Sequence, residues 1–562
     1  MKIQRKMIFL FGILLLVYGC YDDKGSYDYH NINEVVVDLP AAVGVRLLKN
    51  DSVPVDLNPK LTQTQLQNET NLSFKWEIKE SLEGWRLCGE EKSCRIWLQP
   101  EEVSPFTVRL TITDQSPEGT VWYRMVTVTP IPPYNRCWFV LQEVNGRSVL
   151  GAVDGMGESA MVIPDAYRTD VGKELSLEGN PKVLVSNIRY GDAWGGVFSP
   201  GRPVVILMTD RDAVMLNAST FGVEYMLEDM LYGKKLDGDT DFIPEFVFSR
   251  TQVSGEMIID RGELYHAQAD GFSVYYPTVL TRGDKTDFRA KMACSAYEYF
   301  VVYDDLNHRF LGFREGMSYY DAENNQLFRT TGSSGLYESG KKFELALIPE
   351  KEKAPNVFDP NNIGSDKVML DMGVTAQKED TYGKILSFAY SRTDHGVYVY
   401  EINVDADKPA PYGNESNIPW CSGKFKVALP AGVDYENLCF TTSYLWDRLF
   451  FMAAGNKIYK VDLNRLIPTT TVIYEHPDPT VKIVRLKFRL NYFTHYVYNE
   501  DWKAYIKEGL PYLLGAAFNY SADQGGLVEM KLTSSGDILR DENSIHEFKG
   551  FGKIVDIGSN IK

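Results

Sequence analysis

A hairpin pattern that recurs through residues 134–562 constrains the fold of this chain more than any other feature. In each unit an apolar strand leads into a tight turn and a second, alternating strand. Cys137–Glu143, for example, turns at Asn145-Gly146 into Ser148–Val153. Further units are Val204–Thr209 with Ala213–Leu216, Met257–Ile259 with Glu263–Ala267, Tyr299–Tyr303 with Arg309–Phe313, and the similar segments 396–403, 456–463 and 526–533. Hairpins repeated over this length predict a β-propeller-like domain of about six to eight blades. Two or three unrelated β domains in series are the alternative.

The region before this repeat predicts a separate, smaller β domain. Residues 34–130 contain short strands with period-two alternation, the clearest being Leu72–Ile78, Phe106–Thr113 and Val121–Thr129. Trp76 lies mid-strand in an inward-facing set, which is typical of an immunoglobulin-like sandwich. The prolines of residues 130–133 then interrupt the strand pattern and mark the domain boundary.

The overall class is therefore all-β, an N-terminal immunoglobulin- or PKD-like sandwich followed by the propeller-like domain over residues 134–562. The chain contains 34 tyrosines and 28 phenylalanines, which agrees with strand-rich structure. Short helices are expected only at Phe221–Leu231 and Asp501–Leu510.

The first 33 residues predict export and lipid anchoring. Lys2, Arg5 and Lys6 precede the apolar run Met7–Val17, which is shorter than the roughly 20 residues that a spanning helix needs. The run ends at Gly19-Cys20, a sequence that resembles a bacterial lipobox. We therefore expect residues 1–19 to be a lipoprotein signal peptide, Cys20 to be lipidated, and residues 20–33 to form a tether. An ordinary signal peptide with a chance cysteine is the alternative.

The remaining cysteines suggest a disulfide and no metal site. Cys88 and Cys94 flank the polar turn GEEKS between two apolar runs, so they could form a disulfide in an exported protein. No Cys-x-x-Cys occurs and the seven histidines are scattered, so no zinc site is expected. Asp237, Asp239 and Asp241 begin like a calcium loop, but the required glycine and glutamate are missing, so a solvated turn is expected.

Charge and motifs argue against nucleic-acid binding and against catalysis. The chain has 59 basic and 76 acidic residues, a formal charge of −17, whereas phosphate contact needs a basic surface. No metalloprotease or phosphate-loop motif occurs, and the serines of residues 332–340 lack nucleophile-elbow spacing. We expect neither enzymatic activity nor a cofactor.

Three tryptophans are candidates for ligand contact. Trp194 lies between glycines in GDAWGG, Trp420 ends the segment NESNIPW, and Trp446 follows Tyr444 closely. Flat aromatic faces on loops suit sugar rings or peptide side chains. Packing of each ring within the scaffold is the alternative for each of them.

The N-terminus and domain order together resemble a known family. The lipobox followed by CYDDKGSYDYHNINEV, the sandwich-like domain with Trp76 and the long β-rich region are similar to the PKD-like family of Bacteroidota lipoproteins. The acidic residues beside Cys20 also resemble the surface-export signal of such lipoproteins. The resemblance implies a cell-surface role beside SusC/SusD-type outer-membrane uptake systems, and it brings no catalytic residues.

These observations lead to one functional expectation and two alternatives. We expect a non-enzymatic outer-membrane lipoprotein, exposed at the cell surface, that binds or helps capture a nutrient, either a peptide or a glycan, for a SusC/SusD-type TonB-dependent importer. A structural or adhesive protein that uses the propeller as a docking platform is the second reading. A surface hydrolase or lyase with a dispersed site is the third.

Overall fold

The computed structural model places most of the chain, with gaps between the described ranges. These ranges are 33–49, 51–65, 68–80, 84–102, 104–116, 119–134, 136–155, 157–189, 202–230, 244–249, 256–267, 275–277, 279–280, 287–296, 299–314, 318–321, 326–329, 342–343, 346–347, 358–375, 384–403, 420–429, 433, 438–443, 446–465, 467–489, 496–499, 504–507 and 512–561. Strands dominate them, so the all-β prediction is confirmed. The chain divides into two compact units, Met1–Ile131 and Pro132–Lys562, and we describe each by itself.

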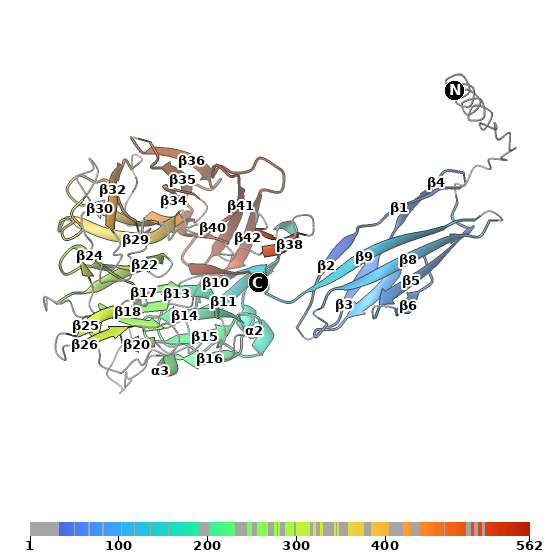
Figure 1. Ribbon diagram of the computed structural model, residues 1–562, viewed down its shortest axis with the longest axis horizontal. Coiled ribbons are helices and arrows are strands. Elements are labelled where there is room, and N and C mark those ends of the chain that lie inside the picture. Colours follow the sequence, from blue (N-terminus) through green and yellow to red (C-terminus); the bar gives the residue numbers. More distant parts are fainter. Residues whose placement is uncertain are drawn as a thin grey trace, which may run out of the picture. The chain divides into compact units, whose positions relative to one another are not determined.

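The first unit is built from nine strands in three sheets (Figure 1). The strands pair in antiparallel fashion, except that β2 is parallel to β9. The largest sheet has the order β2-β9-β8-β5-β6, and the pairs β1–β4 and β3–β7 complete the unit. The strands are β1 (Val35–Asp38), β2 (Ala42–Arg46), β3 (Val53–Leu57), β4 (Lys60–Gln63), β5 (Leu72–Lys79), β6 (Trp85–Gly89), β7 (Cys94–Leu98), β8 (Phe106–Asp114) and β9 (Val121–Ile131).

Alternation along these strands produces the core of the first unit. In β8 the residues Val108, Leu110 and Ile112 are buried, and the residues between them are only partly covered. Trp76 on β5 is fully buried, and its indole N–H donates to the carbonyl of Glu91 at 3.0 Å. The expected inward position of Trp76 is therefore confirmed. β9 runs through Pro130, two residues beyond its pairing with β8, and there pairs in parallel with β2.

The second unit contains seven four-stranded antiparallel sheets among the residues that the structure describes. Each can be read from a first strand to a fourth. They are β43 (Lys553–Ile561), β10 (Arg136–Val144), β11 (Arg147–Asp154) and β12 (Met161–Ile163); β13 (Pro181–Arg189), β14 (Arg202–Thr209), β15 (Ala213–Asn217) and β16 (Val223–Met226); β17 (Pro244–Ser249), β18 (Glu256–Asp260), β19 (Glu263–Ala267) and β20 (Tyr275–Pro277); β22 (Ala290–Ala296), β23 (Tyr299–Asp304), β24 (Arg309–Arg314) and β28 (Ala346–Leu347); β29 (Lys367–Thr375), β30 (Lys384–Ser391), β31 (Val397–Asn403) and β32 (Trp420–Val427); β33 (Leu438–Thr442), β34 (Leu449–Ala454), β35 (Lys457–Asp462) and β36 (Thr469–Glu475); and β37 (Lys482–Phe488), β40 (Tyr512–Asn519), β41 (Gly525–Leu532) and β42 (Ile545–Phe551).

A few short elements supplement these sheets. They are the strand pairs β21 (Val279–Leu280) with β27 (Lys342–Phe343), β25 (Ser318–Asp321) with β26 (Gln326–Arg329) and β38 (Tyr496–Asn499) with β39 (Ala504–Lys507), and the helices η1 (Gly157–Ser159), α2 (Ala166–Val171) and α3 (Leu227–Met230). The helix expected at 501–510 is wrong, because β39 lies there. The one expected at 221–231 is mostly wrong, because β16 fills it up to Met226 and only one helical turn follows.

The hairpins found in the sequence occupy one repeated place in this architecture. β10–β11, β14–β15, β18–β19 and β23–β24 are each the second and third strands of a sheet. The similar segments 396–403, 456–463 and 526–533 correspond to β31, β35 and β41, which are third strands. The second strands include the most apolar ones, such as β34 with the sequence LFFMAA, in which all six residues are buried, as is typical of strands that are covered on both faces.

The first strands follow one another through the second unit. β13 contacts β17, β17 contacts β22, β22 contacts β29, β29 contacts β33, and β33 contacts β37. β43 contacts β13 and β37, and it pairs along its length with β10. The last strand of the chain thus completes the first sheet.

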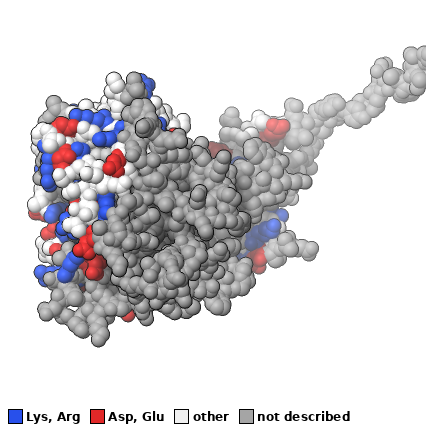
Figure 2. All heavy atoms as spheres, turned by 60° about the vertical axis from the view of Figure 1, so that its left-hand side comes forward, with Lys and Arg blue, Asp and Glu red and all other residues white. Residues whose placement is uncertain are grey.

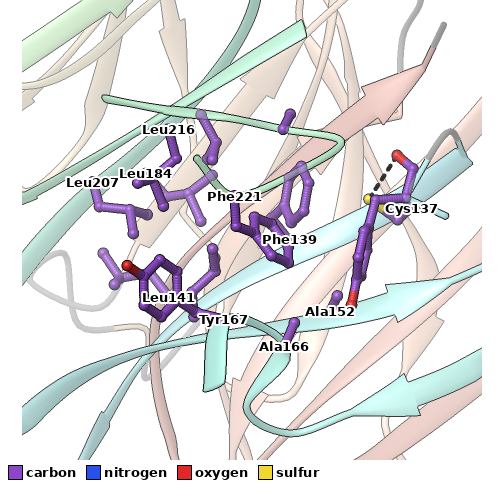
Figure 3. Close-up of a cluster of buried hydrophobic side chains, with 14 of the residues drawn as sticks. Cys137, Phe139, Leu141, Ala152, Ala166, Tyr167, Leu184, Leu207, Leu216 and Phe221 are labelled. Atoms are coloured by element: carbon purple, nitrogen blue, oxygen red, sulfur yellow. Dashed lines mark hydrogen bonds between the residues drawn. The ribbon is translucent and has the colours of Figure 1, made fainter. Parts of the chain in front are cut away.

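Buried side chains fill the spaces between neighbouring sheets. In the cluster of Figure 3, Phe139 from β10 and Tyr167 from α2 pack around Phe221, which follows β15. At the contact between the first and last sheets, Gly515 faces the ring of Trp138, and an added Cβ there would lie 2.5 Å from that ring. A side chain at position 515 would therefore push these two sheets apart.

Candidate functional site

Several of the residues singled out from the sequence are not described in full. Cys20 and Trp194 lie outside the described residues, and so do Asp237, Asp239, Asp241 and the serines of 332–340. Trp420 is the first residue of β32, where only the backbone is described. The lipidation of Cys20 and the ligand contacts of Trp194 and Trp420 therefore stay predictions.

Trp446 does not have the position expected for a ligand-binding ring. Its side chain is 8% exposed and packs on Phe451 and Phe488, with ring centres 5.6 and 5.7 Å away. Its indole N–H donates to the carbonyl of Ser534 at 2.7 Å. The ring therefore packs between β34 and β37, and its polar edge is hydrogen-bonded. We therefore correct the assignment of Trp446 from ligand contact to core.

Cys88 and Cys94 are close together. Cys88 lies on β6 and Cys94 on β7, so they belong to different sheets of the first unit. Both are free thiols in the structure, and their sulfur atoms are 3.7 Å apart. A disulfide needs a separation of about 2.05 Å, so a small movement of the side chains would be required to form one. The disulfide stays a prediction.

A group of unlike charges lies on the first strands of the second unit. The register between the first and second strands shifts by one residue in six of the seven four-stranded sheets. Such bulges turn the following side chain in a new direction. Asp371 on β29, Arg485 on β37 and Asp556 on β43 each come directly after the shift. With Lys487 they form what we call the first-strand cluster.

Asp556 and Lys487 connect three sheets. The Asp556 carboxylate is 5% exposed, accepts the backbone N–H of Leu184 at 2.9 Å and lies 2.9 Å from the Lys487 ammonium. Lys487 also donates to the carbonyl of Leu184 at 3.0 Å. Because these two charges satisfy each other and the backbone of β13, we assign them a structural role.

The Arg485 side chain is held less tightly by ion pairs and hydrogen bonds than those of Asp556 and Lys487. Its guanidinium lies 3.5 Å from Asp556 and donates to the carbonyl of Val484 at 3.2 Å. The side chain remains 45% exposed. A guanidinium has five N–H donors in a planar fork, so this group retains capacity for a carboxylate or another planar acceptor.

Asp371 faces the same charges from β29. Burial raises the pKa of this carboxyl to about 6, although Arg485 and Lys487 act in the opposite direction. Cys439 on β33 lies within their electrostatic influence, and burial raises the pKa of its thiol to about 12. Cys439 is therefore protonated at neutral pH and unsuited to act as a nucleophile.

Within the cluster, Arg485 offers a half-exposed guanidinium, a group that suits polar or anionic acceptors. Among the described residues, no set of three or more histidine, cysteine, aspartate or glutamate side chains is placed to hold a metal ion. The described part of the chain also has no helix of the length and hydropathy needed to cross a membrane. On the part of the face in Figure 2 that is not grey, basic and acidic side chains are intermingled.

Sequence reasoning missed this cluster. Asp371, Arg485 and Asp556 are far apart in the chain, and no motif surrounds them. A charged residue inside an otherwise apolar strand, such as Asp371 in KVMLDMGVT, is the one signal that could have indicated them.

Comparison with solved structures gives only distant similarities. The dihydro-heme d1 dehydrogenase NirN in complex with DHE is 14% identical, with a TM-score of 0.33 over 76% of this chain and 75% of that chain. An ACO/RPE65 chimera is 10% identical, with a TM-score of 0.24 over 94% and 97%. The extracellular domain of a hybrid two-component system from B. thetaiotaomicron is 8% identical, with a TM-score of 0.20 over 80% and 52%. These TM-scores are below the level expected for chains that share a fold.

Comparison with families is more informative for the N-terminal part. No curated protein matches the sequence. The model of the PKD-like family matches residues 20–181, a range that contains all of the described first unit and extends to the beginning of β13. Over these residues, the chain is similar to the PKD-like family.

Proposed function

We propose that the second unit is a closed β-propeller of seven blades. The seven four-stranded sheets and the succession of contacts from β13 to β43 support this reading. The pairing of β43 with β10 joins the first and last parts of the second unit in one sheet, which is how closed propellers protect their edges. In this reading the first strands surround the axis, and Arg485 and Asp371 are axial residues.

The protein, in this proposal, is a non-enzymatic lipoprotein at the cell surface that binds a peptide or glycan nutrient for a SusC/SusD-type importer. Cys20 would carry the lipid in the outer membrane. The observation that carries the binding role is Arg485, a half-exposed guanidinium among otherwise satisfied charges on the first strands. The similarity of residues 20–181 to the PKD-like family agrees with an extracytoplasmic module.

The connections between strands suggest where else a ligand would be contacted. In an antiparallel four-stranded sheet, the first-to-second and third-to-fourth connections lie at one end, and the second-to-third hairpin lies at the other. Residues 190–201 and 404–419 belong to the first kind, whereas hairpin turns such as Asn145-Gly146 are short. Trp194 and Trp420 therefore belong to the end with the longer connections, where we expect the ligand.

Purification of the tagged full chain in mild detergent tests this function. We expect importer subunits and a nutrient-derived ligand to copurify, both identified by mass spectrometry. Arg485→Gln and Trp194→Ala should each reduce the bound ligand by roughly tenfold, with partners and melting temperature unchanged. Arg465→Gln, at an exposed position after β35, is the matched control. Full retention of the ligand by both variants would refute the assigned site.

Anchoring is tested separately in the same cells. Cys20→Ala should release the protein from the membrane fraction, because the acyl chains would be its anchor. Unchanged membrane retention of this variant would refute lipidation at Cys20.

A further inference from the structure

The water-facing side of the largest sheet in the first unit has an unusual composition. Along β9, alternation directs Val121, Tyr123 and Met125 outward, and their side chains are 46%, 64% and 46% exposed. Leu87 on β6 is 47% exposed. The neighbouring strands follow the order β9-β8-β5-β6 (Figure 1). Because β9 and β6 are the outer two of these four strands, these apolar groups lie on the two flanks. We call this side of the sheet the outer face.

The centre of the outer face is polar. One row of paired residues crosses the four strands. It runs from Met125 on β9 to Arg109 on β8, then to Glu77 on β5 and Leu87 on β6. The neighbouring row runs from Tyr123 through threonine at position 111 to lysine at position 75. The outer face therefore has charged and hydroxyl groups between two apolar flanks, over about three strand spacings or 14 Å.

The central charges are held in place by one another. Glu77 accepts two hydrogen bonds from Arg109, at 2.7 and 3.2 Å, and forms an ion pair with Lys75 at 2.7 Å. The Arg109 guanidinium carbon lies 4.1 Å from the centre of the Trp85 ring and 6.0 Å from that of Tyr123. One preorganised cation thus links an aromatic ring on each flank.

The face is basic, in contrast to the chain as a whole. On its two central strands, β5 and β8, this face has three cationic side chains and one carboxylate, namely Lys75, Lys79 and Arg109 against Glu77. The whole chain, in contrast, has a formal charge of −17. Two copies of this face would bring like charges together, which disfavours self-association. An occupant with negative charge is favoured instead.

The arrangement of polar and apolar groups favours a glycan over a protein. Protein interfaces have an apolar core and a polar rim, and the outer face has the reverse order. A protein contact would bury the central hydroxyl and charged groups, and each one left without a partner would cost free energy. A polysaccharide chain has hydroxyl and acidic groups for the centre and C–H faces that can pack on Tyr123 and Met125. We infer that the outer face of the first unit binds an acidic polysaccharide, carboxylated or sulfated, at a site separate from the proposed nutrient site of the second unit.

Binding of defined polymers to the full chain tests this inference. The probes are polygalacturonate for carboxylated chains, heparin for sulfated chains, dextran as the neutral polysaccharide and poly-L-glutamate as the acidic polypeptide. We expect one of the two acidic polysaccharides to bind, and dextran and poly-L-glutamate to bind at least tenfold more weakly. The two acidic arms identify which anionic group is recognised.

Variants then locate the site. Tyr123→Ala and Lys75→Gln, both at well-exposed side chains, should each weaken binding at least tenfold without changing the melting temperature. The matched control is Trp97→Ala, an aromatic side chain that is 53% exposed on β7 of another sheet, and it should bind like wild type. Trp194→Ala should also bind like wild type, which separates this site from the proposed nutrient site. Absence of binding to both acidic polysaccharides, equal binding of poly-L-glutamate, or unchanged affinity of Tyr123→Ala would each overturn the inference.

Discussion

A buried ion pair lies at the contact between the first and last sheets of the second unit. Arg489, which follows β37, and Glu529 on β41 are each 2% exposed, and their side chains are 2.8 Å apart. The same Glu529 oxygen accepts the indole N–H of Trp138 on β10 at 2.7 Å. Arg489 also donates to the carbonyl of Gly155 at 3.0 Å. Both charges therefore connect the last sheet to the first.

Removing one partner should cost far more than removing both. Arg489→Met leaves a buried carboxylate without its cation, which typically costs about 3–5 kcal/mol. In the double variant Arg489→Met with Glu529→Met, no charge remains, and the main loss is the unpaired indole N–H of Trp138, about 1–3 kcal/mol. The double variant should thus be more stable than Arg489→Met alone, although it carries one change more.

Urea unfolding followed by tryptophan fluorescence measures these free energies of unfolding. Lys553→Met is the matched control, because the Lys553–Glu143 pair joins neighbouring strands but is 46% and 31% exposed. Its loss should cost about 0–1 kcal/mol. If Arg489→Met lies within about 1 kcal/mol of wild type, or the double variant is less stable than the single one, the reasoning is refuted.

Three further predictions concern the core, pH and the cysteines. Trp76→Ala should destabilise the first unit by about 3–5 kcal/mol in thermal and urea unfolding, because the ring is fully buried, and a wild-type melting curve would contradict this. The pKa of Asp371 is raised to about 6 from an unfolded value near 3.9, so its contribution to the free energy of unfolding is complete below about pH 4 and is lost as the pH rises to 6. Asp371→Asn should flatten the stability profile between these pH values, whereas a profile parallel to wild type would show that the carboxyl titrates normally. Cys88 and Cys94, with sulfur atoms 3.7 Å apart, should form a disulfide after export, seen as a loss of two hydrogens in the intact mass, and full alkylation of both without a reductant would exclude it.

The sequence by itself determined the local elements, because alternation along a strand and the residues of a tight turn are signals that neighbouring residues carry. Period-two alternation located β5, β8 and β9, and the turn at Asn145-Gly146 located β10–β11. The fully buried Trp76 followed from its place in an inward-facing set. A local signal failed at 501–510, where strand pairing replaced the expected helix.

Tertiary structure alone decided which side chains are available for function. Trp194 and Trp446 look similar in sequence, but the surroundings of Trp446 come from β34 and β37, so no local pattern reports its burial. The first-strand cluster joins residues from three sheets, and the outer face joins Tyr123 to Leu87 through two intervening strands. Register and burial depend on pairings between distant segments, and the sequence specifies these only through the packing of the complete fold.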